Sequence, residues 1–128
     1  MALDLRTSGV SVFLATANPA EATRFYRDVL GLEFVEDSPF AVVFKLAGAE
    51  LRLSKVPSFQ PFPWTVVDWR VDDIDAALAG LAAAGVDLER FDGMDQDERG
   101  VWTVPGGGAQ IAWFMDPDGN VLSVSQRT

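Results

Sequence analysis

The sequence contains one structural unit twice. In each half, a β-rich stretch leads through an Asn/Asp turn into an alanine-rich helical pattern that a glycine closes. The first copy runs from Asn18 to Gly31 and the second from Asp72 to Gly85, a shift of about 54 residues, which is too long and too seldom repeated for a solenoid. Two modules that each bury one sheet face under a helix must share a core or a cleft, so we expect a functional site between them.

Composition narrows the class of protein. The 128 residues fit one domain, 1–128, which can bury most of its apolar surface without disulfides. The sequence has no cysteine, which excludes thiolate metal ligands and a cysteine nucleophile. No apolar run reaches the roughly 20 residues of a membrane span, and the first residues lack a secretory signal pattern. We therefore expect a cytoplasmic protein with no membrane partner.

The charge balance excludes nucleic acid as the main partner. The formal net charge is −9, with 19 acidic and 10 basic residues, and this charge repels a phosphate backbone. An acidic surface can attract cationic ligands, but in many proteins it serves only solubility. Eight of the basic residues are arginine, whose rigid fork of donors fits carboxylates and phosphates.

Local patterns predict the elements of the first module. Asn18 is a good N-cap, Pro19 fits the first helical position and Gly31 ends the helix, which we place at about 19–30. The strands expected around it are 9–16, 32–36, 40–47 and 50–56. Three prolines then resist both helix and strand.

The second module is expected to repeat the order β-α-β-β-β. Asp72 or Asp73 caps a helix of about 74–84, and an acidic loop, 92–100, either closes over the cleft or is simply solvated. The strands expected here are 65–71, 86–91, 101–104, 110–115 and 121–125, one more than in the first module. The predicted organisation is a first module of about 9–56, a linker of 57–64 and a second module of about 65–126.

Several motifs add specificity to this pattern. They are the Phe25-Tyr26-x-x-x-Leu30-Gly31 run, the Val71-Asp72-Asp73-Ile74 helix start and the closing segment from Trp113 to Asn120. With the paired modules, they make the chain resemble the vicinal oxygen chelate superfamily, which includes glyoxalase I, extradiol dioxygenases, fosfomycin-inactivating transferases and bleomycin resistance proteins. The resemblance covers about residues 9–126. It implies a homodimer with an α+β fold, in which two tandem βαβββ modules form a cupped mixed sheet with helices on its outer face.

The resemblance also implies four places for the side chains that bind a divalent metal in enzymes of the superfamily. In this chain they hold Ser11, Arg52, Val66 and Ser123. Arginine stays protonated, valine has no donor atom, and neutral serine hydroxyls replace imidazole and carboxylate poorly. The chain has no histidine at all. We expect a divergent member of the superfamily with no metal and no cofactor.

Strand alternation predicts which other side chains face the cleft, because residues two apart on a strand point the same way. The expected ligand-binding residues are Ser11, Phe13, Arg52, Asp68, Arg70, Trp102 and Ser123. Trp64 and Phe44 are further candidates for the cleft walls. Aromatic side chains beside a few polar groups are typical of a small-molecule pocket.

Two functional classes fit this cleft. In the first, a metal-independent protein binds and sequesters a drug or metabolite, and Arg52 holds a ligand carboxylate or phosphate. Arg52 can instead pair with Asp68 and fill a disused metal site, and the two roles are compatible. The alternative is a lyase, isomerase or dioxygenase-type enzyme without the usual metal site, for which Arg52 as electrophile and Asp68 as base are weak catalytic candidates. A structural or regulatory partner domain, which would need an exposed apolar patch, is a third possibility.

Overall fold

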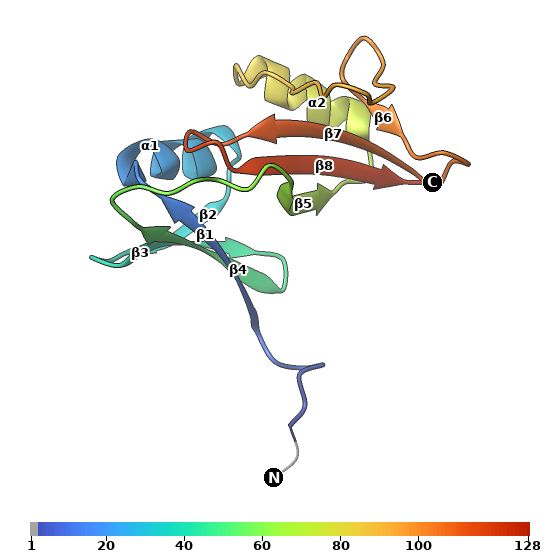
Figure 1. The fold of residues 1–128 in the computed structure, drawn as a ribbon. Coiled ribbons are helices and arrows are strands. Elements are labelled where there is room, and N and C mark those ends of the chain that lie inside the picture. Colours follow the sequence, from blue (N-terminus) through green and yellow to red (C-terminus); the bar gives the residue numbers. More distant parts are fainter. Residues whose placement is uncertain (1–2) are drawn as a thin grey trace. The chain divides into compact units, whose positions relative to one another are not determined.

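The computed structural model describes residues 3–128, which form two compact units (Figure 1). The first unit ends at Gln60 and the second begins at Pro61, inside the expected linker 57–64. Met1 and Ala2, which the expected domain includes, lie outside the described residues. No helix in the described part of the chain is long and apolar enough to span a membrane.

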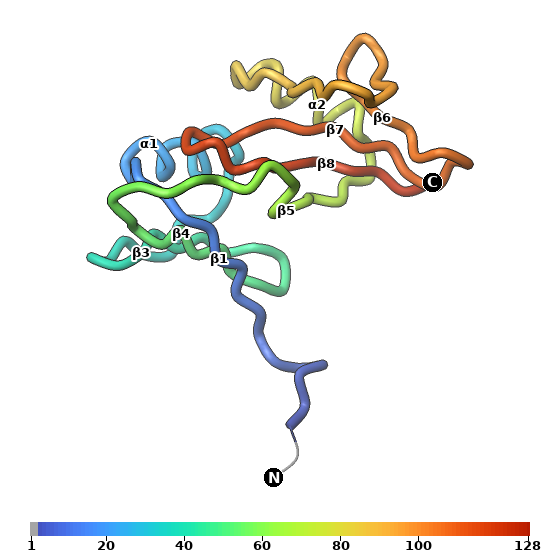
Figure 2. The backbone as a smooth tube through the Cα atoms, in the orientation of Figure 1, coloured from blue at the N-terminus to red at the C-terminus, as the bar shows by residue number. Residues whose placement is uncertain are grey.

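Unit 1 is a four-stranded mixed sheet with one helical segment. Its strands follow the order β1-β4-β3-β2, in which β1 and β4 are parallel and the other pairs antiparallel. The elements are β1 (Val10–Thr16), α1 (Pro19–Arg24), a π-helical turn η1 (Phe25–Val29), β2 (Glu33–Asp37), β3 (Ala41–Leu46) and β4 (Ala49–Lys55). Figure 2 follows the N-terminal segment 3–9 as it extends away from β1.

The predicted first helix is confirmed, and its last turn is wider than expected. Pro19 occupies the start of α1, and the amide of Leu30 donates to the carbonyl of Phe25, which closes the π turn. Tyr26 is fully buried, and its ring contacts those of Phe25 and Phe44 at centroid distances of 5.2 and 5.8 Å. The wider turn therefore belongs to the segment that packs the helix onto its sheet.

Unit 2 repeats the strand order of unit 1. The order β5-β8-β7-β6 again has a parallel first pair and antiparallel partners after it. The elements are β5 (Thr65–Arg70), α2 (Ile74–Ala83), β6 (Trp102–Thr103), β7 (Ala109–Met115) and β8 (Val121–Arg127). Asp73 caps α2, because its carboxylate accepts from the amide of Ala76. The sequence repeat is therefore a repeat of βαβββ structure.

One predicted strand, 86–91, is wrong. Only Glu89 pairs there, through a single bridge to Trp113. The Gln96 side chain accepts from the Phe91 amide at 2.8 Å and donates to the Glu89 carbonyl at 3.0 Å. A side-chain amide thus occupies backbone groups that a strand would use, and the edge of β7 pairs instead with the short strand β6.

Hydrogen bonds also anchor the acidic loop 92–100. Besides its hydrogen bonds with the backbone of Glu89 and Phe91, the Gln96 side chain donates to the carbonyl of Gly100 at 2.8 Å. Arg90 donates to the carbonyls of Gln96 and Asp97, and Arg99 forms ion pairs with Asp75 of α2 and with Asp97. The loop is thereby tied to α2 and to the segment before it.

Replacing Gln96 should loosen this loop. Gln96→Ala removes three hydrogen bonds to part-buried backbone groups, so we expect the free energy of unfolding to fall by about 2 kcal/mol. Amide hydrogen exchange over 89–101 should accelerate. The matched control is Glu98→Ala, an exposed position in the same loop. Equal stability and exchange in the two variants would contradict the anchoring role of Gln96.

The Asp97 carboxyl should make stability depend on pH. Burial acts to raise its pKa, but hydrogen bonds from the Val101 and Arg99 amides and the Arg99 guanidinium outweigh it, so the pKa lies below its ordinary value of 3.8. A lowered folded-state pKa contributes stability above pH 3.8 that is lost as the pH falls through the lowered value.

Urea unfolding of Asp97→Asn at several pH values tests this linkage. The stability difference from the parent should be largest above about pH 4 and should shrink in more acidic solution. The effect will be modest, because the side chain is 42% exposed and solvent screens it. Asp95→Asn, on the same loop, is the control. A pH-independent difference for Asp97→Asn would refute the linkage.

Candidate functional site

Strand register in unit 1 gathers polar and aromatic side chains on one sheet face. Phe13 lies beside Arg52 in the β1–β4 pair, and Ser11 lies beside Glu50. On the other side of β4, Lys45 pairs with Glu50. These five residues form what we call the unit 1 face. Alternate residues of β4 are fully buried on the opposite side, as the predicted alternation requires.

Arg52 is the part-buried cation of this face. Its guanidinium lies over the Phe13 ring, 5.7 Å from the centroid, and its Nη1 is 3.8 Å from Glu50 Oε1. At that distance the guanidinium and the carboxylate form an ion pair but no hydrogen bond. Glu50 Oε1 accepts instead from the Ser11 hydroxyl at 2.9 Å. Within residues 3–128, the guanidinium of Arg52 donates no hydrogen bond, although its side chain is only 30% exposed.

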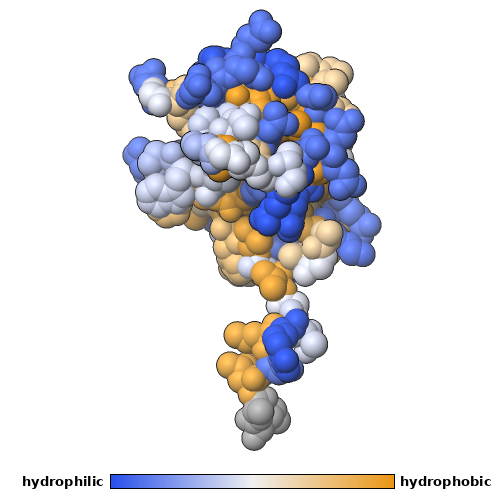
Figure 3. Space-filling model, turned by 90° about the vertical axis from the view of Figure 1, so that its right-hand side faces the viewer, coloured by the Kyte–Doolittle hydropathy of each residue, from blue (hydrophilic) through white to orange (hydrophobic). Residues whose placement is uncertain are grey.

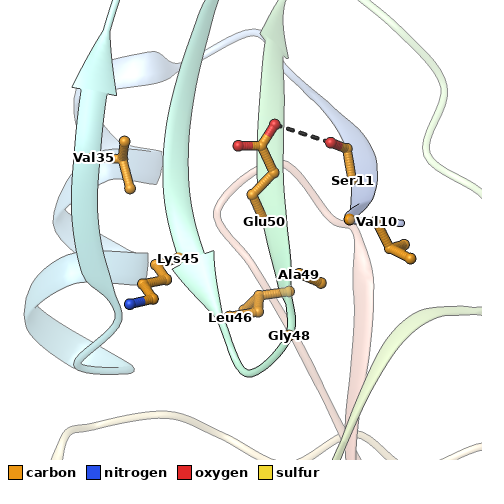
Figure 4. A pocket seen from close by; sticks show the side chains of 9 residues that line it. Val10, Ser11, Val35, Lys45, Leu46, Gly48, Ala49 and Glu50 are labelled. Carbon is orange, nitrogen blue, oxygen red and sulfur yellow. Dashed lines mark hydrogen bonds between the residues drawn. The ribbon is translucent and has the colours of Figure 1, made fainter. Parts of the chain in front are cut away.

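A pocket of about 550 Å³ adjoins the Ser11–Glu50 pair (Figure 4). It lies by the β3–β4 hairpin, and both charged and apolar side chains line it. Its lining residues are Gly9, Val10, Ser11, Val35, Lys45, Leu46, Gly48, Ala49 and Glu50. Such a mixture can enclose an apolar ligand body and still hydrogen-bond its polar edge.

The predicted residues of unit 2 meet around one carboxylate. The Ser123 hydroxyl donates to Asp68 Oδ1 and the Ser125 hydroxyl to Asp68 Oδ2, each at 2.6 Å. Both serines are buried, and Arg70 pairs with Ser125 in the strand register. Because each oxygen of Asp68 already accepts a short hydrogen bond, Asp68 is suited to orient the serines and not to abstract a proton from a substrate.

Trp102 lies elsewhere in unit 2. It lies on β6 opposite Ile111, with its ring 6.3 Å from that of the buried Trp113. A pocket of about 460 Å³ lies beside it. The pocket is lined by Asp95, Asp97, Val101, Trp102, Thr103 and Pro105. Trp102 therefore lines a pocket together with the acidic loop, and its expected place in a cleft between the modules stays a prediction.

The structure places the predicted site residues in two groups. Unit 1 brings Ser11, Phe13 and Arg52 onto one face, and unit 2 brings Asp68 and Ser123 into contact. A shared cleft, including an Arg52–Asp68 pair, would involve both units and stays a prediction.

The structure also places the two further wall candidates, Phe44 and Trp64. Phe44 as a cleft wall is wrong, because its parity places it under the helix, where it is fully buried against Tyr26. Trp64 is exposed and stacks on Phe62 at 4.9 Å. Glu50 and Lys45 were missed, although Glu50, two residues before Arg52, has the parity that should have revealed it.

The side chains at the four expected metal positions do not fit a divalent cation. The hydroxyls of Ser11 and Ser123 donate to carboxylates, and Arg52 and Val66 have no lone pair to offer. Among residues 3–128, no group of three or more His, Cys, Asp or Glu side chains is placed to hold a metal ion. The donor set thus disagrees with a metal at this position.

Comparisons with known proteins agree with this architecture. The family model of the Glyoxalase/Bleomycin resistance protein/Dioxygenase superfamily matches residues 10–124. A comparison with curated protein sequences finds no match.

Three solved structures illustrate the likeness. Lactoylglutathione lyase from Agrobacterium tumefaciens has a TM-score of 0.70 and 22% identity, with 91% of each chain covered. TnmS3, an antibiotic binding protein from Streptomyces sp. CB03234, has a TM-score of 0.70 and 24% identity over 100% of this chain and 99% of that one. A glyoxalase/bleomycin resistance protein/dioxygenase from Alicyclobacillus acidocaldarius has a TM-score of 0.67 and 14% identity, with 97% and 95% covered.

At these identities the likeness shows a shared fold. The family match covers most of the chain, and both units have the βαβββ order that the repeat predicted. The chain belongs to the glyoxalase/bleomycin resistance protein/dioxygenase superfamily.

Proposed function

We propose that this protein binds a small organic molecule without a divalent metal and sequesters it, as a resistance or carrier protein does. The observation that carries the proposal is the unit 1 face. There, an arginine without a hydrogen-bond acceptor lies over an exposed aromatic ring, beside a pocket of about 550 Å³. Among the described residues no buried side-chain nitrogen or oxygen lacks a hydrogen-bond partner, so the N–H groups of Arg52 are open to solvent, where a ligand oxygen can reach them.

The relatives support a binding role without specifying the ligand. One structural neighbour is an antibiotic binding protein and another is a lyase, so the same fold accommodates both binding and chemistry. What separates the two roles is the site. In this chain the four metal positions have the wrong donors, and Asp68, the candidate base, is held by two serines. Binding alone is the function that these groups support best.

A test of this proposal compares ligands with and without metal. The purified protein, stripped with EDTA, is screened by thermal shift against small aromatic acids, amines and neutral aromatics. A molecule that binds the native state raises the melting temperature, and we expect at least one of these compounds to do so with EDTA present. Elemental analysis of the same sample should find no stoichiometric divalent metal. Turnover that depends on one bound zinc, manganese or magnesium per chain would refute the proposal.

We also propose that the protein is cytoplasmic and that it forms a homodimer, as the resemblance implies. Unit 1 exposes several large apolar side chains, and Figure 3 shows apolar surface along the N-terminal segment. The exposed large apolar residues of unit 1 are, among those described, Leu3, Leu5, Val10, Phe13, Phe34, Val35 and Phe40. Exposed apolar surface of this kind is often covered by a partner.

Light scattering coupled to size-exclusion chromatography measures the assembly. The expected mass is twice the 13.9 kDa of one chain, and it should persist on dilution into the low micromolar range, roughly the level at which weak dimers dissociate. A mass of one chain at all concentrations would contradict the dimer and leave the binding proposal standing.

A further inference from the structure

We infer that the ligand of the unit 1 face is an organic monocarboxylate with a flat, apolar body, held side-on by Arg52. This inference rests on the proposed function and specifies the ligand class of the same site. Three features support it: the free edge of the guanidinium, the acidic groups around it, and the apolar surface next to it.

The donor geometry of Arg52 selects a carboxylate. Its Nη1 is 3.8 Å from Glu50 Oε1, and within residues 3–128 the guanidinium donates no hydrogen bond, so the edge formed by Nε and Nη2 has no acceptor there. Two parallel N–H groups on one edge match the two oxygens of a carboxylate, and such paired charge-assisted bonds are roughly twice as strong as neutral ones. The same edge gives little to a neutral amide, which has one acceptor oxygen, and repels an ammonium group.

Neighbouring charges favour one negative charge over two. Glu50 is only 3.8 Å from the guanidinium, and Ser11 holds it there with a hydrogen bond of 2.9 Å. Two further acidic residues, Glu33 and Glu36, lie on β2, about 10 Å from β4 at the usual strand spacing. The unit 1 face has one further cation, Lys45, which pairs with Glu50, so the acidic residues outnumber the basic ones. A phosphate, with a charge of about −1.5 to −2, would be repelled by these carboxylates more strongly than a monocarboxylate.

The surroundings of Arg52 suit an apolar ligand body. Phe13 is 64% exposed although the guanidinium covers part of its ring. The Ser11–Glu50 pair lies two residues along β1 and β4 from the Phe13–Arg52 pair, about 7 Å away. The pocket begins there, and Val10 and Val35 line it. A ligand anchored by its carboxylate at Arg52 can therefore contact Phe13 and extend a fused-ring body into this pocket. Figure 4 shows the Ser11–Glu50 pair beside which such a body would lie.

The experiment uses four probes that share one naphthyl body. Calorimetry on the full-length protein compares 2-naphthoate with the neutral 2-naphthamide, the cation 2-naphthylmethylamine and the dianion 2-naphthyl phosphate. We expect the carboxylate to bind most tightly, with the amide about tenfold weaker because one charged hydrogen-bond pair is lost. The amine should bind most weakly.

Three variants locate the interaction. Arg52→Gln should weaken 2-naphthoate about ten- to hundredfold, and Arg52→Lys, which keeps the charge without the fork, should lie between it and the parent. Arg27→Gln is the matched control, because it removes the same charge from unit 1 at an exposed helical residue paired with Asp28. The control should bind 2-naphthoate like the parent. Circular dichroism and melting temperature confirm that each variant is folded.

Each result bears on the inference. Equal binding of carboxylate and amide, preference for the amine or the phosphate, or an Arg52→Gln affinity equal to that of the Arg27→Gln control would overturn the carboxylate assignment. Absence of 2-naphthoate binding would also overturn it. Metal-free binding of any other probe would nevertheless uphold the proposed function, whereas metal-dependent turnover would refute the function itself.

Discussion

The parallel strand pair at the start of each unit is the constraint on which the rest depends. A parallel pair cannot be closed by a tight turn, so the chain must cross over through a helix and two further strands before it returns. This pairing fixes a register, and the register decides which side chains share a face. Phe13 lies beside Arg52, and Asp68 beside Ser123, only because β1 and β5 pair with the last strand of their own unit. A slip by one residue would bury these polar groups under a helix.

The two units have the same strand order, but the charged side chains on their sheets differ in sign and in hydrogen bonding. In unit 2 the charged group, Asp68, has both oxygens satisfied by the hydroxyls of two buried serines. In unit 1 the charged group, Arg52, has a long ion pair, an aromatic ring and no hydrogen-bond acceptor. A satisfied network stiffens a sheet face, whereas an unsatisfied donor favours any acceptor that arrives. Unit 2 therefore has a polar cluster with its hydrogen bonds made, and unit 1 has a cation with donors still free.

The helices and the two faces of the strands could be predicted from the sequence, because the signals for them are local. Asn18 and Pro19 mark the first helix, Asp73 caps the second, and strand alternation separates the buried face of a strand from its opposite face. The failures come from tertiary contacts. Residues 86–91 have strand composition, but the Gln96 side chain, further along the chain, takes their backbone groups, and no local pattern shows this.

The candidate site shows the same division. Arg52 was found because a motif fixes its position, and Ser123 was found in the same way. The sequence does not single out Glu50 and Lys45, because the four metal positions that the resemblance implies do not include their neighbours across the sheet. Only the register shows that Glu50 holds Ser11 and faces Arg52.

An arginine at a position where the resemblance implies a metal ligand changes the kind of recognition that is available. A guanidinium is fixed covalently, always charged and directional, so it can orient two ligand oxygens without an exchangeable ion. It has no empty coordination position and cannot polarise a bound oxygen as strongly as a divalent cation does. The substitution therefore retains positive charge and ligand orientation and gives up metal-assisted activation. Asp68, held by its serines, is likewise a poor candidate for a base, which supports the proposed binding role.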